Sequence, residues 1–147
     1  MGGRFILLVE DNPDDEALAL RALAKCGMTP RVEVVRDGAE ALDAVLGRGR
    51  FAGEDLPEVV LLDLKLPKLS GIDVLRRMRS EPRTEVVPVV VLTSSSEDRD
   101  IVDSYRAGAN SYVRKPVDFE EFTRAVRELG HFWLSVNESP NRPVKQR

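Results

Sequence analysis

Short apolar runs alternate with longer amphipathic segments along the chain, and the hydrophobic period changes from one to the next. Continuous runs rich in Val, Leu and Ile predict β-strands that are buried on both faces. The predicted strands cover residues 5–9, 31–35, 59–62, 88–92 and 111–114. Apolar residues spaced three and four positions apart predict helices between these strands. The predicted helices cover residues 13–26, 37–46, 72–79 and 98–107, with a long last helix that Asp118 caps.

This alternation predicts an α/β fold in which a doubly wound parallel sheet of five strands carries helices on both faces. In the flavodoxin-like form of this fold the strand order is 2-1-3-4-5, so the first and third strands are neighbours. Neither repeats nor low-complexity segments interrupt the pattern. We therefore expect one domain over residues 1–136, ending in an extended helix, and a flexible basic tail over residues 137–147.

Chemically distinctive residues follow the predicted strands. Glu10 and Asp11 follow the first, Asp63 follows the third, Thr93 ends the fourth and Lys115 follows the fifth. Parallel strands bring their carboxyl ends to one edge, where open α/β sheets bind ligands. Carboxylates about 4 Å apart repel each other by about 1–4 kcal/mol per pair, so the cluster needs a cation. Oxygen ligands without nearby His or Cys favour Mg²⁺, with Mn²⁺ as a substitute, over zinc.

A carboxylate held beside a divalent cation can attack phosphorus and form an aspartyl phosphate. The cation, Lys115 and the Thr93 hydroxyl would then neutralise the phosphoryl oxygens. Taken singly, each residue also has an ordinary explanation, since Asp11 or Asn12 can simply cap the next helix. Their joint placement at successive strand ends favours a phosphoryl-transfer site.

Residues 4–130 resemble the receiver domain of two-component response regulators. The motifs that carry the resemblance are V-E-D-N, L-L-D-L-K-L-P-K-L-S-G, V-L-T-S and Y-V-R-K-P. The resemblance implies that Asp63 accepts the phosphoryl group from a sensor histidine kinase, and that Asp11 binds the metal directly. It further implies the following roles: Glu10 as an acid that reaches the metal through water, the Lys65 carbonyl as a metal ligand, Thr93 as the switch hydroxyl, Lys115 as the phosphate-pairing lysine, a cis bond before Pro116, and Tyr112 as the aromatic switch.

Two features depart from or vary within the family pattern. The acidic pair is Glu-Asp where Asp-Asp is commoner, a change that should not abolish metal binding. Lys65 and Ser95 occupy positions that tune the dephosphorylation rate in the family. A narrower likeness, carried by V-E-D-N-P-D-D-E and F-W-L-S-V-N-E-S-P, is to small regulators paired with bacterial phytochrome kinases. That likeness makes a bacteriophytochrome a candidate partner.

Family behaviour implies an output through protein contacts, with phosphorylation reshaping the face made by the fourth helix, fifth strand and fifth helix. The last helix carries an apolar stripe, part of which must pack on the sheet. Phe132, Trp133 and Leu134 lie at its end, beyond the usual length of the family's domain. We expect this cluster to form a homodimer interface.

Composition adds few constraints. The 147 residues suit one domain, and a net charge of -3 argues against a nucleic-acid partner. The apolar runs are too short to cross a membrane and no segment has the features of a signal peptide, so we predict a cytoplasmic protein without a membrane partner. The only cysteine, Cys26, excludes an internal disulfide and is predicted to be a small buried hydrophobe.

Alternatives remain open. A phosphorelay intermediate shares these residues, and a scaffolding pseudo-receiver shares the fold. A haloacid-dehalogenase-like phosphatase needs a second aspartate where Lys65 stands, and a nucleotide-binding domain needs a glycine-rich phosphate loop after the first strand. Any catalysis here would be limited to the chain's own phosphorylation and dephosphorylation, in a protein that primarily signals.

Overall fold

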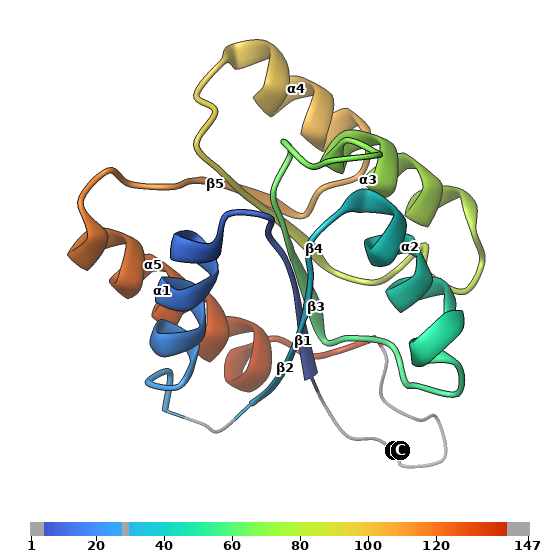
Figure 1. Cartoon of the computed structure of the whole chain (residues 1–147), viewed down its shortest axis with the longest axis horizontal. Coiled ribbons are helices and arrows are strands. Elements are labelled where there is room, and N and C mark those ends of the chain that lie inside the picture. The colour runs from blue at the N-terminus through green and yellow to red at the C-terminus, as the bar shows by residue number, and fades with distance from the viewer. Residues whose placement is uncertain (1–4, 28–29, 141–147) are drawn as a thin grey trace.

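The computed structural model describes residues 5–27 and 30–140, which fold into a five-stranded parallel sheet flanked by helices (Figure 1). The strands are β1 (Phe5–Val9), β2 (Arg31–Val35), β3 (Val59–Leu62), β4 (Val89–Thr93) and β5 (Ser111–Arg114). The α-helices are α1 (Pro13–Leu23), α2 (Gly38–Leu46), α3 (Gly71–Ser80), α4 (Asp98–Arg106) and α5 (Phe119–His131). A short 3-10 turn, η1 (Gly49–Phe51), follows α2, and a π-helical turn, η2 (Phe132–Val136), continues α5. The order β2-β1-β3-β4-β5 confirms the predicted flavodoxin-like fold.

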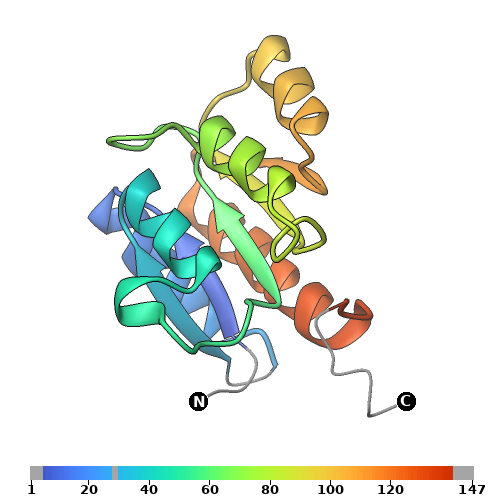
Figure 2. The ribbon, with the colours of Figure 1, turned by 90° about the vertical axis from the view of Figure 1, so that its right-hand side faces the viewer.

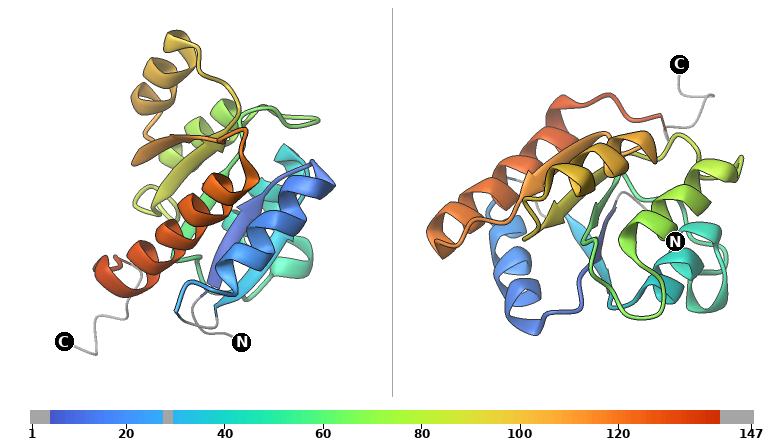
Figure 3. Two further views of the ribbon diagram at one scale, coloured as in Figure 1. Left: turned by 90° about the vertical axis from the view of Figure 1, so that its left-hand side faces the viewer. Right: turned by 90° about the horizontal axis from the view of Figure 1, so that it is seen from above.

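The central strands are buried on both faces, as their continuous apolar runs predict. Every residue of β1, β3 and β4 is buried. Because side chains alternate along a strand, Phe5, Leu7 and Val9 join one apolar cluster while Ile6 and Leu8 join the other. Helices α2 and α3 cover the first face, with α4 near the edge (Figure 2), and α1 and α5 cover the second (Figure 3).

Helix α1 is shorter than the sequence pattern predicts. It ends at Leu23 rather than at residue 26, and Gly27 lies beyond it with a positive φ of 92°. The amides of Lys25 and Cys26 donate to the carbonyls three residues earlier, which tightens the chain into turns after the helix. Cys26 is buried, as predicted, but in this turn rather than within the helix.

The chain after α5 stays on the domain further than predicted. The Ser139 hydroxyl donates a hydrogen bond to Glu58 Oε2 at 2.8 Å, so the ordered chain passes the expected boundary at residue 137. The basic end of the predicted tail, residues 141–147, lies outside the described residues. Across the described residues, each helix lacks the length or the apolar content needed to span a membrane.

Candidate functional site

The predicted site residues meet at one sheet edge because backbone pairing continues beyond the strands. The Glu10 amide donates to the Val35 carbonyl at 3.0 Å, and the Asp63 amide donates to the Val9 carbonyl at 3.1 Å. These bonds hold the residues that follow β1 and β3 in register. On the other side, the Lys115 amide donates to the Thr93 carbonyl at 2.7 Å. The backbone thus fixes where each functional side chain begins.

Three carboxylates converge at this edge. Glu10, Asp11 and Asp63 each offer an oxygen within 4.8 Å of the others. Glu10 and Asp63 are buried, whereas Asp11 is exposed, so the cluster opens to solvent on one side. Oxygen donors around a site open to water suit a hard divalent cation. The three residues therefore fit the predicted metal site.

The capping alternative is settled by Asn12. Its side-chain oxygen accepts hydrogen bonds from the amides of Asp14 and Asp15, at 2.9 and 3.0 Å, and so caps α1. The Asn12 amide in turn donates to Glu10 Oε2 at 3.1 Å. The helix start is therefore satisfied without Asp11, which leaves the Asp11 carboxylate available to a cation.

Lys115 places its ammonium group among the carboxylates. Its Nζ lies 2.6 Å from Glu10 Oε1, 2.9 Å from Asp15 Oδ2 and 3.1 Å from Asp63 Oδ2. Since the Lys115 side chain is only 9% exposed, these ion pairs are largely shielded from water. The ammonium supplies the positive charge that the acidic cluster requires.

Burial and charge shift the acid–base equilibria of this cluster. Burial raises the pKa of Glu10 from its ordinary value of 4.5 to about 7, although the Lys115 ammonium acts in the opposite direction. For Lys115, burial lowers the pKa, but hydrogen bonds to Glu10 and Asp15 outweigh it, so the pKa stands above its ordinary value. The lysine therefore stays charged at neutral pH, while Glu10 exchanges its proton close to neutrality.

The Asp63 carboxylate is also bound from the side of β4 and from its own loop. The buried Thr93 hydroxyl donates to Asp63 Oδ1 at 2.9 Å, and the Lys65 amide donates to the same oxygen at 3.2 Å. Two residues beyond Thr93, the Ser95 carbonyl accepts a hydrogen bond from the Tyr112 hydroxyl at 2.9 Å. A short stretch of chain thus connects the site to the predicted aromatic switch.

Comparison with known proteins identifies this arrangement. Residues 6–127 match the response regulator receiver domain family. The chain belongs to this family. It is 46% identical over 136 residues to the probable methanogenesis regulatory protein FilR2 of Methanothrix harundinacea, an alignment that covers 92% of this chain and 87% of FilR2.

Two solved structures place this receiver domain near the phytochrome-associated regulators. The phosphorylated cyanobacterial phytochrome response regulator RcpA has a TM-score of 0.89 at 37% identity, covering 95% of this chain and 99% of RcpA. The Mn²⁺-bound response regulator Rcp1, from Synechocystis, has a TM-score of 0.88 at 32% identity, covering 94% of this chain and 99% of Rcp1. The predicted family and the narrower likeness are both confirmed.

Two residues of the receiver site were missed by the sequence analysis. Asp15, which contacts Lys115, was not predicted to be a site residue. Gly71 begins α3 against the loop that starts at Asp63, where an added Cβ would lie 2.7 Å from the Leu64 Cα and would clash with the Asp63 carbonyl oxygen. The available signals for Gly71 were its position directly before the predicted helix and its place at the end of the L-L-D-L-K-L-P-K-L-S-G motif.

Two predictions about the receiver domain are wrong. The peptide bond before Pro116 is trans, not cis. The two forms of such a bond differ by only about 0.5–1 kcal/mol, so the surrounding fold decides between them. Leu134, a predicted interface residue, is only 4% exposed and packs with the core residues between the sheet, α1 and α5. The interface candidates therefore reduce to Phe132 and Trp133.

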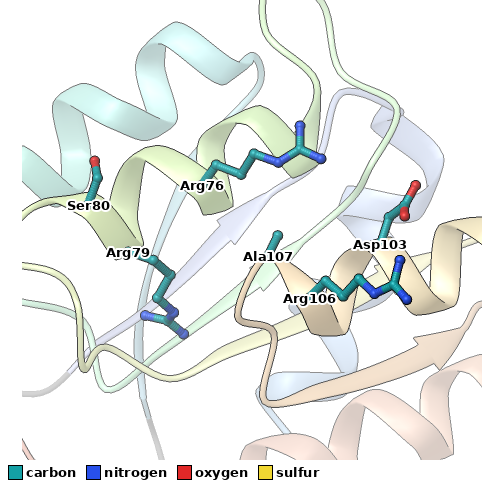
Figure 4. A pocket seen from close by; sticks show the side chains of 6 residues that line it. All are labelled: Arg76, Arg79, Ser80, Asp103, Arg106 and Ala107. Carbon is teal, nitrogen blue, oxygen red and sulfur yellow. The ribbon is translucent and has the colours of Figure 1, made fainter.

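Apart from the carboxylate cluster, an arginine-lined pocket of about 500 Å³ lies between α3 and α4 (Figure 4). Its lining residues are Arg76, Arg79, Ser80, Asp103, Arg106 and Ala107. Arg79 donates hydrogen bonds to the Val87 and Gly108 carbonyls, at 2.8 Å each, at the start of β4 and β5. These bonds give Arg79 a structural role at the sheet edge opposite the carboxylates.

Proposed function

We propose that Asp63 receives a phosphoryl group from a phosphohistidine of a sensor histidine kinase. An Asp63 oxygen attacks phosphorus as the phosphorus–nitrogen bond breaks, and the imidazole leaves with a proton. The observation that carries this proposal is the convergence of Lys115 and Thr93 on the buried Asp63 carboxylate, at 3.1 and 2.9 Å. Both groups can move from the carboxylate to the phosphoryl oxygens and neutralise their charge.

We propose Mg²⁺ as the cation of this site, with Mn²⁺ as a working substitute. Glu10, Asp11, Asp63 and the Lys65 carbonyl would hold it. When bound, it neutralises the carboxylates and the incoming phosphoryl oxygens. The support is the cluster of oxygen donors, open to water on the Asp11 side, and the Mn²⁺ in the Rcp1 structure.

The phosphoacceptor is tested by substitution. Asp63→Asn should abolish hydroxylamine-labile labelling from acetyl phosphate or from a kinase, because an amide is a far weaker nucleophile than a carboxylate. Asp98→Asn, an exposed substitution on α4, should label like the wild type. Persistent labelling of the Asp63→Asn protein would place the phosphoryl group elsewhere.

We further propose that the kinase is of the bacteriophytochrome type. The support is the likeness to RcpA and Rcp1 over 90% or more of this chain. A phosphotransfer profile against the host's histidine kinases tests it, because the cognate kinase should transfer far faster than all others. A kinase donor fed by ATP also implies a cytoplasmic location, which fractionation of host cells tests.

The output is proposed to run through Thr93 and Tyr112 to the surface of α4, β5 and α5. Tyr112 bonds to the loop that follows Thr93, so a movement of Thr93 toward a phosphoryl group changes the surroundings of the ring. Val102 and Tyr105 on α4 are both more than 40% exposed and would belong to the contact surface. A contact with another protein, rather than with DNA, suits these side chains.

We propose that a second copy of the chain binds at the end of α5. Phe132 is 44% exposed and meets the Trp133 ring edge-on, with 5.1 Å between the ring centroids. An apolar groove lies beside them, between β5 and α5. Aromatic side chains beside a groove are typical of interface hot spots.

The dimer is tested by mass in solution. Sedimentation of the wild type should show a dimer that Phe132→Glu dissociates, because the substitution buries a charge in the interface. Val86→Glu, at an exposed apolar position before β4, should leave the dimer intact. A concentration-independent monomer would refute the proposal.

A further inference from the structure

Asp15 is the one partner of Lys115 that the phosphoryl-transfer site does not otherwise use. It lies in the first turn of α1, where its amide is bound by the Asn12 cap, and its side chain is 32% exposed. Its Oδ2 lies 2.9 Å from Lys115 Nζ. The two residues are 100 positions apart in the sequence, with Asp15 on α1 and Lys115 between β5 and α5. They meet where the start of α1, which packs beside α5 (Figure 3), lies next to the segment that follows β5.

The ammonium of Lys115 is fully occupied in this arrangement. It has three protons, and three carboxylates accept from it, at 2.6 Å for Glu10, 2.9 Å for Asp15 and 3.1 Å for Asp63. Glu10 and Asp63 also belong to the cation site. Any stronger hold of Lys115 on these two carboxylates opposes the cation, whereas its hold on Asp15 does not.

We infer that Asp15 is a positioning residue that competes for the Lys115 ammonium, both with Glu10 and Asp63 in the resting protein and with a phosphoryl group on Asp63. This inference rests on the proposed function. Asp15 draws the ammonium away from Glu10 and Asp63, which favours cation binding. Once a phosphoryl group is present, Asp15 competes with it for the same ammonium and adds a repelling negative charge. Asp15 therefore strengthens the binding of the cation and weakens the binding of the phosphoryl group.

The substitution Asp15→Asn separates these effects. We expect the Kd for Mg²⁺, measured by titration calorimetry, to rise about three- to tenfold, because Lys115 then turns fully to Glu10 and Asp63. At saturating Mg²⁺, we expect the Kd for beryllofluoride, a phosphoryl analogue followed by ¹⁹F NMR, to fall by a similar factor. If Asp15→Asn only removed a structural contact, both Kd values would rise. A rise in the Kd for Mg²⁺ together with a fall in the Kd for beryllofluoride is therefore the diagnostic result.

Asp14→Asn is the matched control. It removes the same charge from the same helix turn, but no ion pair joins Asp14 to Lys115 within the described residues. Both affinities should stay within about twofold of the wild type, because this variant keeps all three ion pairs of Lys115. The loss of helix-dipole stabilisation is common to the two variants and therefore cancels when they are compared. Asp15→Glu keeps the charge and should lie nearer to the wild type than Asp15→Asn does.

The outcomes separate this inference from the proposed function. If wild-type protein binds both ligands and Asp15→Asn matches Asp14→Asn, or shifts both affinities the same way, the role of Asp15 is refuted. If wild-type protein binds no beryllofluoride, the phosphoacceptor proposal itself fails. Should Asp15→Asn fold poorly by circular dichroism, Asp15→Ser also removes the charge and provides the same comparison, with Asp15→Glu as the variant that keeps it.

Discussion

The hydroxyl of Thr93 donates a hydrogen bond to the Asp63 carboxylate at 2.9 Å, and both side chains are buried. A phosphoryl group on Asp63 would take over this hydroxyl, because its oxygens carry more charge than the carboxylate oxygen they replace. The chain that follows Thr93 reaches Ser95, whose carbonyl is bound by Tyr112. A change at Asp63 is thus connected to Tyr112 through only three residues of β4 and its loop.

Thr93→Val removes this hydroxyl but keeps the side chain's shape. We expect the metal-free protein to lose about 1–3 kcal/mol of unfolding free energy, because a buried hydrogen bond to a charged group is lost. Urea unfolding followed by the fluorescence of Trp133 measures this. Beryllofluoride should no longer shift the NMR signals of the Tyr112 ring in this variant.

Thr84→Val is the control for that experiment. The buried Thr84 hydroxyl donates to the Met78 carbonyl at 2.6 Å, far from the carboxylates along the chain. We expect a loss of stability of similar size, about 1 kcal/mol, with a normal Tyr112 response. A normal Tyr112 response in Thr93→Val as well would contradict the role of Thr93.

Lys115→Met should affect the cation and the phosphoryl analogue in opposite directions. Removing the ammonium leaves buried carboxylates unpaired, so the metal-free protein should lose about 2–4 kcal/mol of unfolding free energy. Mg²⁺ should bind more tightly, since no ammonium competes for Glu10 and Asp63, while beryllofluoride binding should be lost. Calorimetry and thermal melts with and without Mg²⁺ measure these effects, with the exposed Lys25→Met as control. Weakened Mg²⁺ binding would show that Lys115 does not compete with the cation.

Mg²⁺ binding should depend on pH through Glu10. Because burial raises the pKa of Glu10 to about 7, a proton must leave before a cation binds, and the affinity should fall about tenfold per pH unit below 7. Calorimetry at pH 8, 7 and 6 measures this. Glu10→Gln should bind Mg²⁺ more weakly but with little pH dependence in this range. A wild-type affinity that stays constant from pH 8 to 6 would argue against the raised pKa.

The same pKa predicts a pH dependence of stability in the metal-free protein. The folded state holds the Glu10 proton more tightly than the unfolded chain, whose pKa is near the ordinary 4.5. This contribution to stability is fully present below pH 4.5 and is lost as the pH rises through about 7. Glu10→Gln should therefore gain stability relative to the wild type between pH 5 and pH 8, as measured by urea unfolding. A constant difference between the two proteins would contradict this linkage.

Gly71→Ala should disturb the loop that starts at Asp63. The added Cβ meets backbone atoms of Asp63 and Leu64, which cannot rotate away, so we expect a loss of about 2–4 kcal/mol and weaker Mg²⁺ binding. Gly27→Ala is the comparison, since its Cβ meets nothing within 4 Å and the positive φ is the only source of strain. That variant should lose about 1 kcal/mol and bind Mg²⁺ normally. Normal Mg²⁺ binding by Gly71→Ala would show that the loop tolerates the shift.

The sequence by itself determined the sheet and the edge at which Glu10, Asp63 and Lys115 gather. Strands buried on both faces must be apolar throughout, so their ends are visible as the first polar residues. A parallel sheet then brings these ends to one edge, whatever the detailed packing. The family motifs at the same positions imply the role proposed for each residue.

Tertiary structure alone decided which neighbours these residues have. Helical periodicity does not say which side chain of α1 faces the strand ends, so the contact of Asp15 with Lys115, which follows β5, depends on how α1 packs in the folded domain. Leu134 is buried because the π-helical turn after α5 directs it back to the core. The trans bond before Pro116 rests on an energy difference too small for local sequence to fix. In each case the deciding interaction joins residues far apart in the chain or depends on small differences that only the folded environment resolves.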